Sequence, residues 1–348
     1  MQTMFKAFLV ALLVVGVSAP AALAADREIL GAGATFPFPL YSKMFDVYNK
    51  KTGVRVNYQS IGSGGGIQQI SAKTVEFGAS DAFLKDNEIK SFSAPVVHVP
   101  MALGAVAIAY NLPGNDEIKL TSDVLADIYL GNIKKWNDAR IKALNSSVAL
   151  PNLPITVVYR SDGSGTTSIF TTYLAEVNSE WKNDVGAGKS VNWPVGIGGK
   201  GNSGVAGTLK QIPGGIAYLE LSYCIQNKLS VAALKNSSGK FVKASLESTA
   251  LAAEGEKIPA DTRINLVNTD SDAGYPIAGL TWIIVYKDQA YGNRSKADAK
   301  QLVELLWWMT HEGQQYSEPL DYAKLSPGLQ KKSEVILKSI TFKGESLL

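Results

Sequence analysis

The amino-acid sequence predicts an α/β protein built from two lobes. Strand-like and helix-like segments alternate along the chain, which is the pattern of an α/β fold. About 320 residues follow an apolar N-terminal segment, and this is more than one hydrophobic core normally holds. Two long β-like runs, residues 95–112 and 275–287, are candidates for segments in which the chain crosses from one lobe to the other.

Residues 1–24, MQTMFKAFLVALLVVGVSAPAALA, have the features of a secretory signal peptide. A single lysine precedes an apolar run, and the segment ends in the small-residue pattern Ala-Leu-Ala. The run is too short to span a membrane comfortably, and no comparable run follows it. The only cysteine, Cys224, leaves no internal disulfide and no lipid-anchor residue after the signal. We expect cleavage after Ala24 or one residue later, and a location in a bacterial periplasm.

Two crossings divide the remaining chain into one discontinuous lobe and one continuous lobe. The first run is too long for one ordinary strand and has Gly104 at its middle. The second follows a polar stretch, residues 235–272, that has little periodicity. We therefore expect lobe I to comprise residues 25–104 and 278–348, and lobe II to comprise residues 105–277.

Shorter segments are assigned by their periodicity and composition. VRVNYQSI (54–61) and EFGASD (76–81) are strand-like, and GGIQQISAKTV (65–75) between them is helix-like. GGIAYLELSYCIQ (214–226) is strand-like throughout, and we expect Cys224 within it to be a buried, inert thiol.

Charge and composition argue against several classes of function. The formal net charge of +3 falls to +2 when Lys6 leaves with the signal, and no basic stripe indicates a nucleic-acid partner. His98 and His311 are too few and too scattered for a metal site, so neither a metal nor another cofactor is expected. We interpret both histidines as structural. Trp307 and Trp308, in an amphipathic C-terminal helix, are interpreted as core residues.

Four short stretches rich in small and hydroxyl residues stand at strand-to-helix junctions. They are GAGATFPFP (31–39), SIGSGGGIQQI (60–70), FGASDAF (77–83) and RSDGSGTT (160–167). Each has an alternative interpretation as a plain loop. Ligands of open α/β sheets bind at the carboxyl ends of strands, so the recurrence of these stretches favours a binding site. None of them matches the nucleotide-binding motif G-x-x-x-x-G-K-[ST].

The stretch RSDGSGTT carries the strongest indication of an anion site. It follows the β-like run PITVVY and precedes TSIFTTYLAEV, whose apolar residues have helical spacing. A strand, a Gly-rich turn and a helix N-terminus aim free N–H groups and the positive end of a dipole at one point. Arg160 would bind the anion bidentately and carry the positive charge, with Asp162 holding it by an ion pair. An alternative role for Asp162 is an N-cap or Asx turn.

If the anion is phosphate, the other stretches supply neutral donors. These are the hydroxyl groups of Thr35, Ser63, Ser164 and Thr166 and the backbone N–H groups of Phe36, Gly165 and Thr166. Asp81 is then the unusual member, because a carboxylate repels an anion unless the anion offers it a hydrogen. Phosphate carries such a hydrogen near neutral pH and sulfate does not. Asp81 would therefore favour the binding of phosphate over sulfate by the free energy of one charged hydrogen bond, about 1.5–3 kcal/mol.

Seven segments, taken in order, resemble the PstS family, the periplasmic phosphate-binding proteins of bacterial Pst ABC transporters. They are GAGATFPFPLY, VNYQSIGSGGGIQQI, FGASDA, DIYLGNIKKWND, RSDGSGTT, VGIGGKGNSGVAG and PGGIAYLE, and the resemblance covers essentially the whole mature chain. It implies a two-lobed periplasmic binding protein of type II that closes around one dehydrated phosphate in the interlobe cleft. It also implies delivery of that phosphate to the membrane permease subunits, a monomeric state and no enzymatic activity.

The resemblance also assigns the ligand residues. Thr35, Phe36, Ser63 and Asp81 would bind phosphate from lobe I, and Arg160, Ser164, Gly165 and Thr166 from lobe II, with Asp162 as the partner of Arg160. Three positions depart from the family's pattern: Ser161, Phe83 and Ser203 stand where alanine, proline and aspartate are common. These departures flank the ligand positions, so they bear on affinity and hinge detail more than on identity.

Three other functions compete with this hypothesis. A phosphatase or esterase could use Ser63 or Ser164 as its nucleophile, but neither lies in G-x-S-x-G and no cluster of metal ligands is evident. A binding protein for another oxyanion is disfavoured by Asp81. A secreted phosphate-binding adhesin that reuses the same fold stays open.

Overall fold

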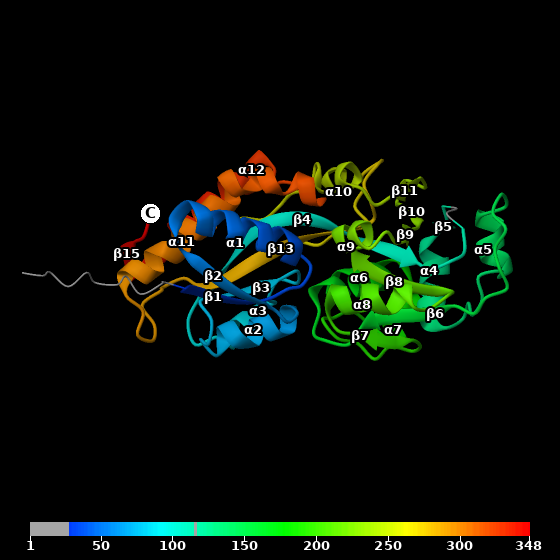
Figure 1. Cartoon of the computed structure of the whole chain (residues 1–348), viewed down its shortest axis with the longest axis horizontal. Helices are drawn as coiled ribbons and strands as arrows, with labels where there is room; N and C mark the ends of the chain where they lie inside the picture. The colour runs from blue at the N-terminus through cyan, green and yellow to red at the C-terminus, as the bar shows by residue number, and fades with distance from the viewer. Residues whose placement is uncertain (1–27, 115–116) are drawn as a thin grey trace, which may run out of the picture.

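The computed structural model describes residues 28–348 except residues 115 and 116. The predicted signal peptide, residues 1–24, lies outside the described residues. Figure 1 shows two lobes side by side along the long axis of the molecule, with β4 (Val96–Tyr110) running from one into the other. Within the described part of the chain, none of the helices is long and apolar enough to cross a membrane.

Lobe I is a mixed sheet with helices on both faces. Its strand order is β2-β1-β3-β13-β4, in which β1 is parallel to β2 and β3, and β13 is antiparallel to β3 and β4. The strands other than β4 are β1 (Glu28–Gly33), β2 (Arg55–Ser60), β3 (Phe77–Ser80), β12 (Leu266–Val267), which pairs with β13, and β13 (Ile277–Tyr286). The helices are α1 (Phe38–Thr52), α2 (Ser63–Ser71), α3 (Asp86–Lys90), α11 (Lys296–Thr310) and α12 (Pro327–Lys338). In Figure 1, α1 and α11 lie on one side of this sheet and α2 and α3 on the other.

Lobe II continues the same sheet in the order β4-β8-β6-β7. Its strands are β6 (Thr156–Arg160), β7 (Ile197–Gly199), β8 (Gly215–Glu220) and β9 (Ser230–Val231), and a small second sheet contains β5 (Lys119–Leu120), β10 (Ala233–Lys235) and β11 (Phe241–Lys243). Its helices are α4 (Ser122–Leu130), α5 (Ala139–Leu144), α6 (Gly165–Val177), α7 (Ser179–Asp184), α8 (Gly201–Lys210), α9 (Leu221–Gln226) and α10 (Leu246–Ala253). A C-terminal hairpin joins β14 (Thr341–Phe342) and β15 (Glu345–Ser346), after the 3₁₀ turns Glu312–Tyr316 and Glu318–Leu320.

Strand β4 belongs to both lobes, because its partners change along its length. It pairs with β13 up to Ala105 and with β8 from Val106 onward. A chain crossing within residues 95–112 is therefore present, as the length of that run predicted. The second long run forms β13, which is buried over its whole length and pairs with β4 inside lobe I. The lobe boundaries proposed from the sequence remain a prediction.

The sequence prediction was wrong for the second half of GGIAYLELSYCIQ. The strand stops at Glu220, whose carboxylate caps α9 by accepting a hydrogen bond from the backbone N–H of Ser222 at 3.0 Å. Cys224 consequently lies on a helix, although it is buried as expected. Burial raises the pKa of the Cys224 thiol well above its ordinary value, with the charge of Glu220 adding to the shift, which makes it unreactive.

The C-terminal helix α11 has the amphipathic pattern predicted for it. Trp308 is buried in the core, whereas Trp307 is only half-buried and stacks on His311, with ring centroids 4.3 Å apart. Trp307 therefore packs at the edge of the core rather than inside it.

Candidate functional site

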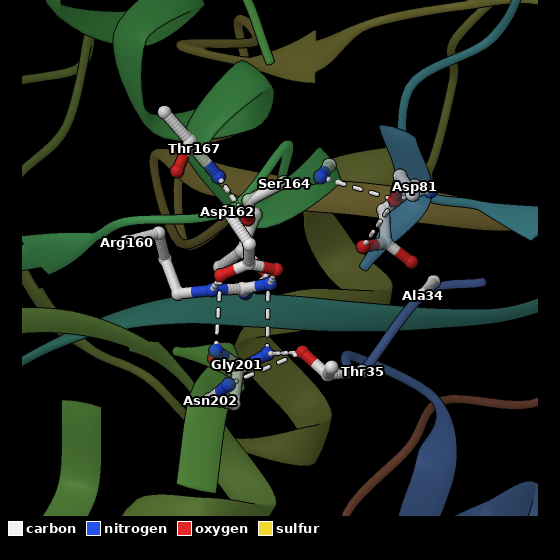
Figure 2. Close-up of polar contacts among 12 residues, drawn as sticks. Ala34, Thr35, Asp81, Arg160, Asp162, Ser164, Thr167, Gly201 and Asn202 are labelled. Atoms are coloured by element: carbon white, nitrogen blue, oxygen red, sulfur yellow. Dashed lines mark hydrogen bonds and ion pairs between the residues drawn. The ribbon is translucent and has the colours of Figure 1, made fainter. Parts of the chain in front are cut away.

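The carboxyl ends of the parallel strands in both lobes meet at the cleft. β1, β2 and β3 run parallel in lobe I and end just before Thr35, Ser63 and Asp81. β6 and β7 run parallel in lobe II and end at Arg160 and just before the start of α8. Parallel strands bring their carboxyl ends to one edge of a sheet, so residues distant in sequence gather there. Figure 2 shows Thr35 and Asp81 of lobe I converging on Arg160 and Asp162 of lobe II.

The lobe I half of the site centres on Asp81, which is 3% exposed. The Thr281 hydroxyl donates to Oδ1 of Asp81 at 2.8 Å. The Ser63 hydroxyl oxygen lies 3.5 Å from Oδ2 and accepts the backbone N–H of Asp81 at 3.3 Å. Burial raises the pKa of Asp81 to about 7, although the Thr281 bond, the charge of Arg160 and the Ser63 bond all act to lower it.

The lobe II half of the site centres on Arg160, which is 4% exposed. Asp162 holds its guanidinium with a bidentate pair, Nε to Oδ1 at 2.8 Å and Nη2 to Oδ2 at 2.6 Å. Burial alone would raise the pKa of Asp162, but hydrogen bonding to Arg160 and its charge lower that pKa below its ordinary value. Asp162 is therefore a carboxylate at neutral pH. It also accepts the backbone N–H of Gly201 at 2.9 Å, which ties the start of α8 to the arginine.

The N-terminus of α6 lies beside both halves. Ser164 is its N-cap, with the Oγ accepting the N–H of Thr167 at 3.0 Å, so the helix dipole points from its first turn into the cleft. Gly165 follows, and a Cβ there would lie only 2.6 Å from Oδ2 of Asp81 and from Oγ of Ser63. No side chain larger than hydrogen fits at this point without movement.

The two lobes contact each other directly around the site. The Gly64 N–H donates to the Gly163 carbonyl at 2.8 Å, and the Gly165 N–H donates to Ser63 Oγ at 3.0 Å. The Thr35 backbone carbonyl accepts the Tyr223 hydroxyl at 2.6 Å. A side chain on Gly64 would come within 3.1 Å of Gly163, so the glycines of SIGSGGG and RSDGSG permit this approach.

Sequence comparisons identify the family. Residues 18–310 match the PBP superfamily domain. The phosphate-binding protein PstS of Xylella fastidiosa (strain 9a5c) is 44% identical over 313 residues, which cover 88% of this chain and 84% of that protein. The phosphate-binding protein PstS of Haemophilus influenzae is 43% identical, over 86% of this chain and 89% of that protein. The chain belongs to the PstS family of phosphate-binding proteins.

Solved structures bear out the fold of this PstS-family chain. A high affinity periplasmic phosphate-binding protein, PfluDING, solved bound with phosphate, matches with a TM-score of 0.72 at 20% identity. The match covers 89% of this chain and 93% of that one. At that identity the likeness speaks for the fold alone, and it confirms the two-lobed α/β class predicted from the sequence.

All nine residues predicted for the PstS-type site lie together in the cleft. One chain of hydrogen bonds runs from Thr35 through Asn202 to Thr166 and on to Arg160. In a second group, the Ser63 hydroxyl is hydrogen-bonded to Asp81 and to the backbone N–H of Gly165. Phe36 follows Thr35 in the same turn, and its ring is fully buried against the lobe I core. That these residues bind a ligand remains a prediction, taken up below.

Two residues that hydrogen-bond to the predicted site residues, Asn202 and Thr281, were missed by the sequence reasoning. Asn202 lies fully buried in the first turn of α8, and the strand–glycine–helix pattern of VGIGGKGNSG was a signal that could have found it. Thr281 lies in the middle of β13, where no local pattern marks it. Antiparallel pairing of Trp282 with Ser80 brings Thr281 opposite Asp81.

A solvent-open groove of about 640 Å³ lies outside the PstS-type site. Phe38, Lys200 and Gln226 line it, and it touches the site only at its edge, through Thr35 and Asp162. Ser63, Asp81 and Arg160 are not among the residues that line the groove.

The histidines lie apart from this site. His98 is buried, its Nε2 accepts the N–H of Leu84 at 3.0 Å, and burial together with the charge of Arg263 lowers the pKa of His98 to about 4. It is a neutral structural residue. Over residues 28–348 without 115 and 116, no three His, Cys, Asp or Glu side chains come together as a metal site would require.

Proposed function

We propose that this PstS-family chain binds inorganic phosphate between its lobes in the bacterial periplasm and delivers it to the membrane permease of an ABC importer. The names of its relatives support the ligand. The single observation that carries the proposal is Asp81, a buried carboxylate placed among hydrogen-bond donors.

The donor set suits a small tetrahedral anion. Arg160 has five N–H groups, of which two bind Asp162 and one binds Thr166, so two are left for a ligand. The hydroxyl of Ser164 and the N-terminus of α6 add neutral donors, whereas in this structure the Ser63 O–H is donated to Asp81 and the Gly165 N–H to Ser63. A fixed arginine and a helix N-terminus together favour a phosphate-like anion over a neutral ligand.

Asp81 adds the requirement that the anion carry a hydrogen. As a carboxylate it can only accept, so HPO₄²⁻ or H₂PO₄⁻ forms a charged hydrogen bond with it. Sulfate has no hydrogen near neutral pH and would leave two negative charges in contact within a buried site. The proposal therefore includes discrimination between two anions of almost the same shape.

Each lobe holds part of the donor set, so the ligand stabilises the closed arrangement by contacts that the open one lacks. A permease could then distinguish loaded from empty protein by the shape of the closed pair of lobes. The proposal takes the chain to be a monomeric transport receptor. It includes no catalytic activity, because among the described residues neither Ser63 nor Ser164 has a histidine base as a hydrogen-bond partner.

Calorimetry on the mature protein, stripped of ligand by unfolding and refolding, tests the proposal. Phosphate, sulfate and arsenate are titrated separately at pH 8. We expect one-to-one binding of phosphate and far weaker binding of sulfate. Absence of phosphate binding to a folded, ligand-free sample would contradict the proposal and would favour the adhesin or enzyme hypotheses.

A further inference from the structure

Asn202 is a buried side chain that links hydroxyl groups of the two lobes and has no assigned role. It is fully buried at the start of α8. Its Nδ2 donates to the Thr35 hydroxyl oxygen at 2.9 Å and to the Thr166 hydroxyl oxygen at 3.2 Å. Its Oδ1 accepts the backbone N–H of Glu220 at 3.0 Å, which fixes the orientation of the amide. One amide therefore holds a hydroxyl from each lobe, and Figure 2 shows Asn202 beside Thr35.

The Thr35 hydroxyl receives two hydrogen bonds from Asn202. Besides Nδ2, the backbone N–H of Asn202 donates to Thr35 Oγ1 at 3.2 Å. A hydroxyl group has one O–H donor and two acceptor lone pairs. With both lone pairs occupied, Thr35 keeps only its O–H, and that hydrogen must point away from Asn202.

The Thr166 hydroxyl is held in the same manner by two different donors. Its Oγ1 accepts from Asn202 Nδ2 at 3.2 Å and from Arg160 Nη1 at 3.3 Å. Both lone pairs are again occupied, so this hydroxyl can only donate. Both threonines are nearly or fully buried, so water does not compete for these bonds.

We propose that Asn202 is a positioning residue that makes Thr35 and Thr166 donate, and never accept, toward the bound phosphate. The proposal rests on the phosphate-binding function proposed above and deepens it. Hydroxyl groups are otherwise ambivalent, and a site built from them could accept hydrogens from H₂PO₄⁻ as readily as donate. Removing the acceptor option from two hydroxyls leaves Asp81 as the designated acceptor and gives the cleft a fixed hydrogen pattern.

Asn202→Asp is the informative variant. It keeps an oxygen for the N–H of Glu220 and replaces only the donor that faces the threonines, so their hydroxyls turn toward the new carboxylate. Asn202→Ala removes the donor without a new acceptor. Matched controls are Asn183→Asp and Asn183→Ala, on an exposed face of α7 in the same lobe.

Phosphate dissociation constants are measured by calorimetry for each variant, with circular dichroism and thermal unfolding of the ligand-free proteins. We expect phosphate affinity to fall about tenfold or more for Asn202→Ala, which corresponds to the loss of one charged hydrogen bond to phosphate. For Asn202→Asp we expect a fall of about 100-fold or more, which corresponds to the loss of two such bonds. The Asn183 variants should bind within about twofold of the wild type, since Asn183 lies outside the site.

A double-mutant cycle separates positioning from simple packing. If Asn202 acts through the two hydroxyls, Asn202→Ala should weaken phosphate binding less than about threefold in a Thr35→Val, Thr166→Val background. An equal loss in both backgrounds, wild-type affinity in Asn202→Asp, or unfolding of both Asn202 variants would overturn the inference while phosphate binding by the wild type stands. Failure of the wild type to bind phosphate would overturn the proposed function and this inference together.

Discussion

The hydroxyl of Thr281 donates a hydrogen bond to Oδ1 of Asp81, 2.8 Å away, and thereby leaves Oδ2 facing the donors of the cleft. Oδ2 lies near Ser63 on its own lobe and near Gly165 at the start of α6 on the other. The carboxyl group of Asp81 is thus oriented by a strand whose register brings Thr281 opposite it.

Sulfate binding should depend on pH through Asp81. The pKa of Asp81 is raised by burial to about 7, so below pH 7 the carboxyl is protonated and can donate to sulfate. Above pH 7 it is a carboxylate, and each bound sulfate must bring a proton with it. We expect sulfate affinity to fall about tenfold per pH unit between pH 7 and 8.5, measured by calorimetry.

The matched variant for this prediction is Asp81→Asn, which offers a neutral donor at every pH. Its sulfate affinity should not vary between pH 5.5 and 8.5, and it should lose selectivity against sulfate more than it loses phosphate affinity. A wild-type sulfate affinity that stays flat over this range would show that Asp81 is not the filter.

Arg160 should contribute to binding far more than an exposed arginine of the same lobe. Arg160→Ala removes the two N–H donors left for the anion and also leaves Asp162 without its partner. We expect phosphate affinity to fall at least about 100-fold, together with a loss of stability of about 3–5 kcal/mol from the unpaired carboxylate. The measurements are calorimetry and urea unfolding.

The control is Arg140→Ala, which breaks half-exposed ion pairs with Asp127 and Asp138 on the surface of lobe II. Exposed pairs contribute about 0–1 kcal/mol, so stability should change within that limit and phosphate affinity should not change. Equal effects of the two substitutions on phosphate affinity would show that Arg160 does not bind phosphate.

Local sequence patterns predict much of this architecture. Strand and helix periodicity predicted β2, β3, β4, β6 and α6, and glycine and hydroxyl clusters at their junctions indicated the cleft residues. Thr281 was missed because its contact with Asp81 depends on strand register between segments 200 positions apart. The change from strand to helix at Glu220 was missed because Glu220 caps the helix from a buried position, and the residues on both sides of it continue the same apolar run. Local patterns therefore predicted the strands and helices, whereas pairing between distant segments determined which residues, such as Thr281, contact the predicted site residues.

Gly165 should tolerate no side chain. A Cβ there would lie 2.6 Å from Asp81 and Ser63, so Gly165→Ala forces the lobes apart where the ligand is held. We expect phosphate affinity to fall at least about fivefold, as for 1–3 kcal/mol of overpacking. Gly207→Ala on α8 is the matched control, because a Cβ there meets nothing within 4 Å. It should stabilise the protein by about 0.5–1 kcal/mol and leave binding unchanged. Indistinguishable binding by the two alanine variants would contradict the packing argument.

Glu220 should make the ligand-free protein less stable as the pH rises. Its carboxyl is fully buried where β4 passes from one lobe to the other, with Oε2 bound to Ser222 and 3.0 Å from the Tyr322 hydroxyl. Among the described residues, Oε1 has no hydrogen-bond partner. Burial raises the pKa of Glu220 from 4.5 to about 8, although the bonds from Ser222 and Tyr322 lower it. The folded state therefore holds a proton that the unfolded state releases.

The resulting stability is fully present below pH 4.5 and is lost as the pH rises to about 8. Across that window the free energy of unfolding should fall on the order of 1 kcal/mol per pH unit from this group alone. Glu220→Gln keeps the shape of the side chain without the titration, so urea unfolding at pH 5, 6.5 and 8 should give it a shallower decline than the wild type. Asp81 and Glu76, whose pKa values are also raised, contribute in the same direction, whereas His98, whose pKa is lowered from 6.5 to about 4, contributes in the opposite direction over that range. Parallel pH profiles for the two proteins would mean that Glu220 is charged in the folded state and that its buried carboxylate is stabilised by contacts other than those with Ser222 and Tyr322.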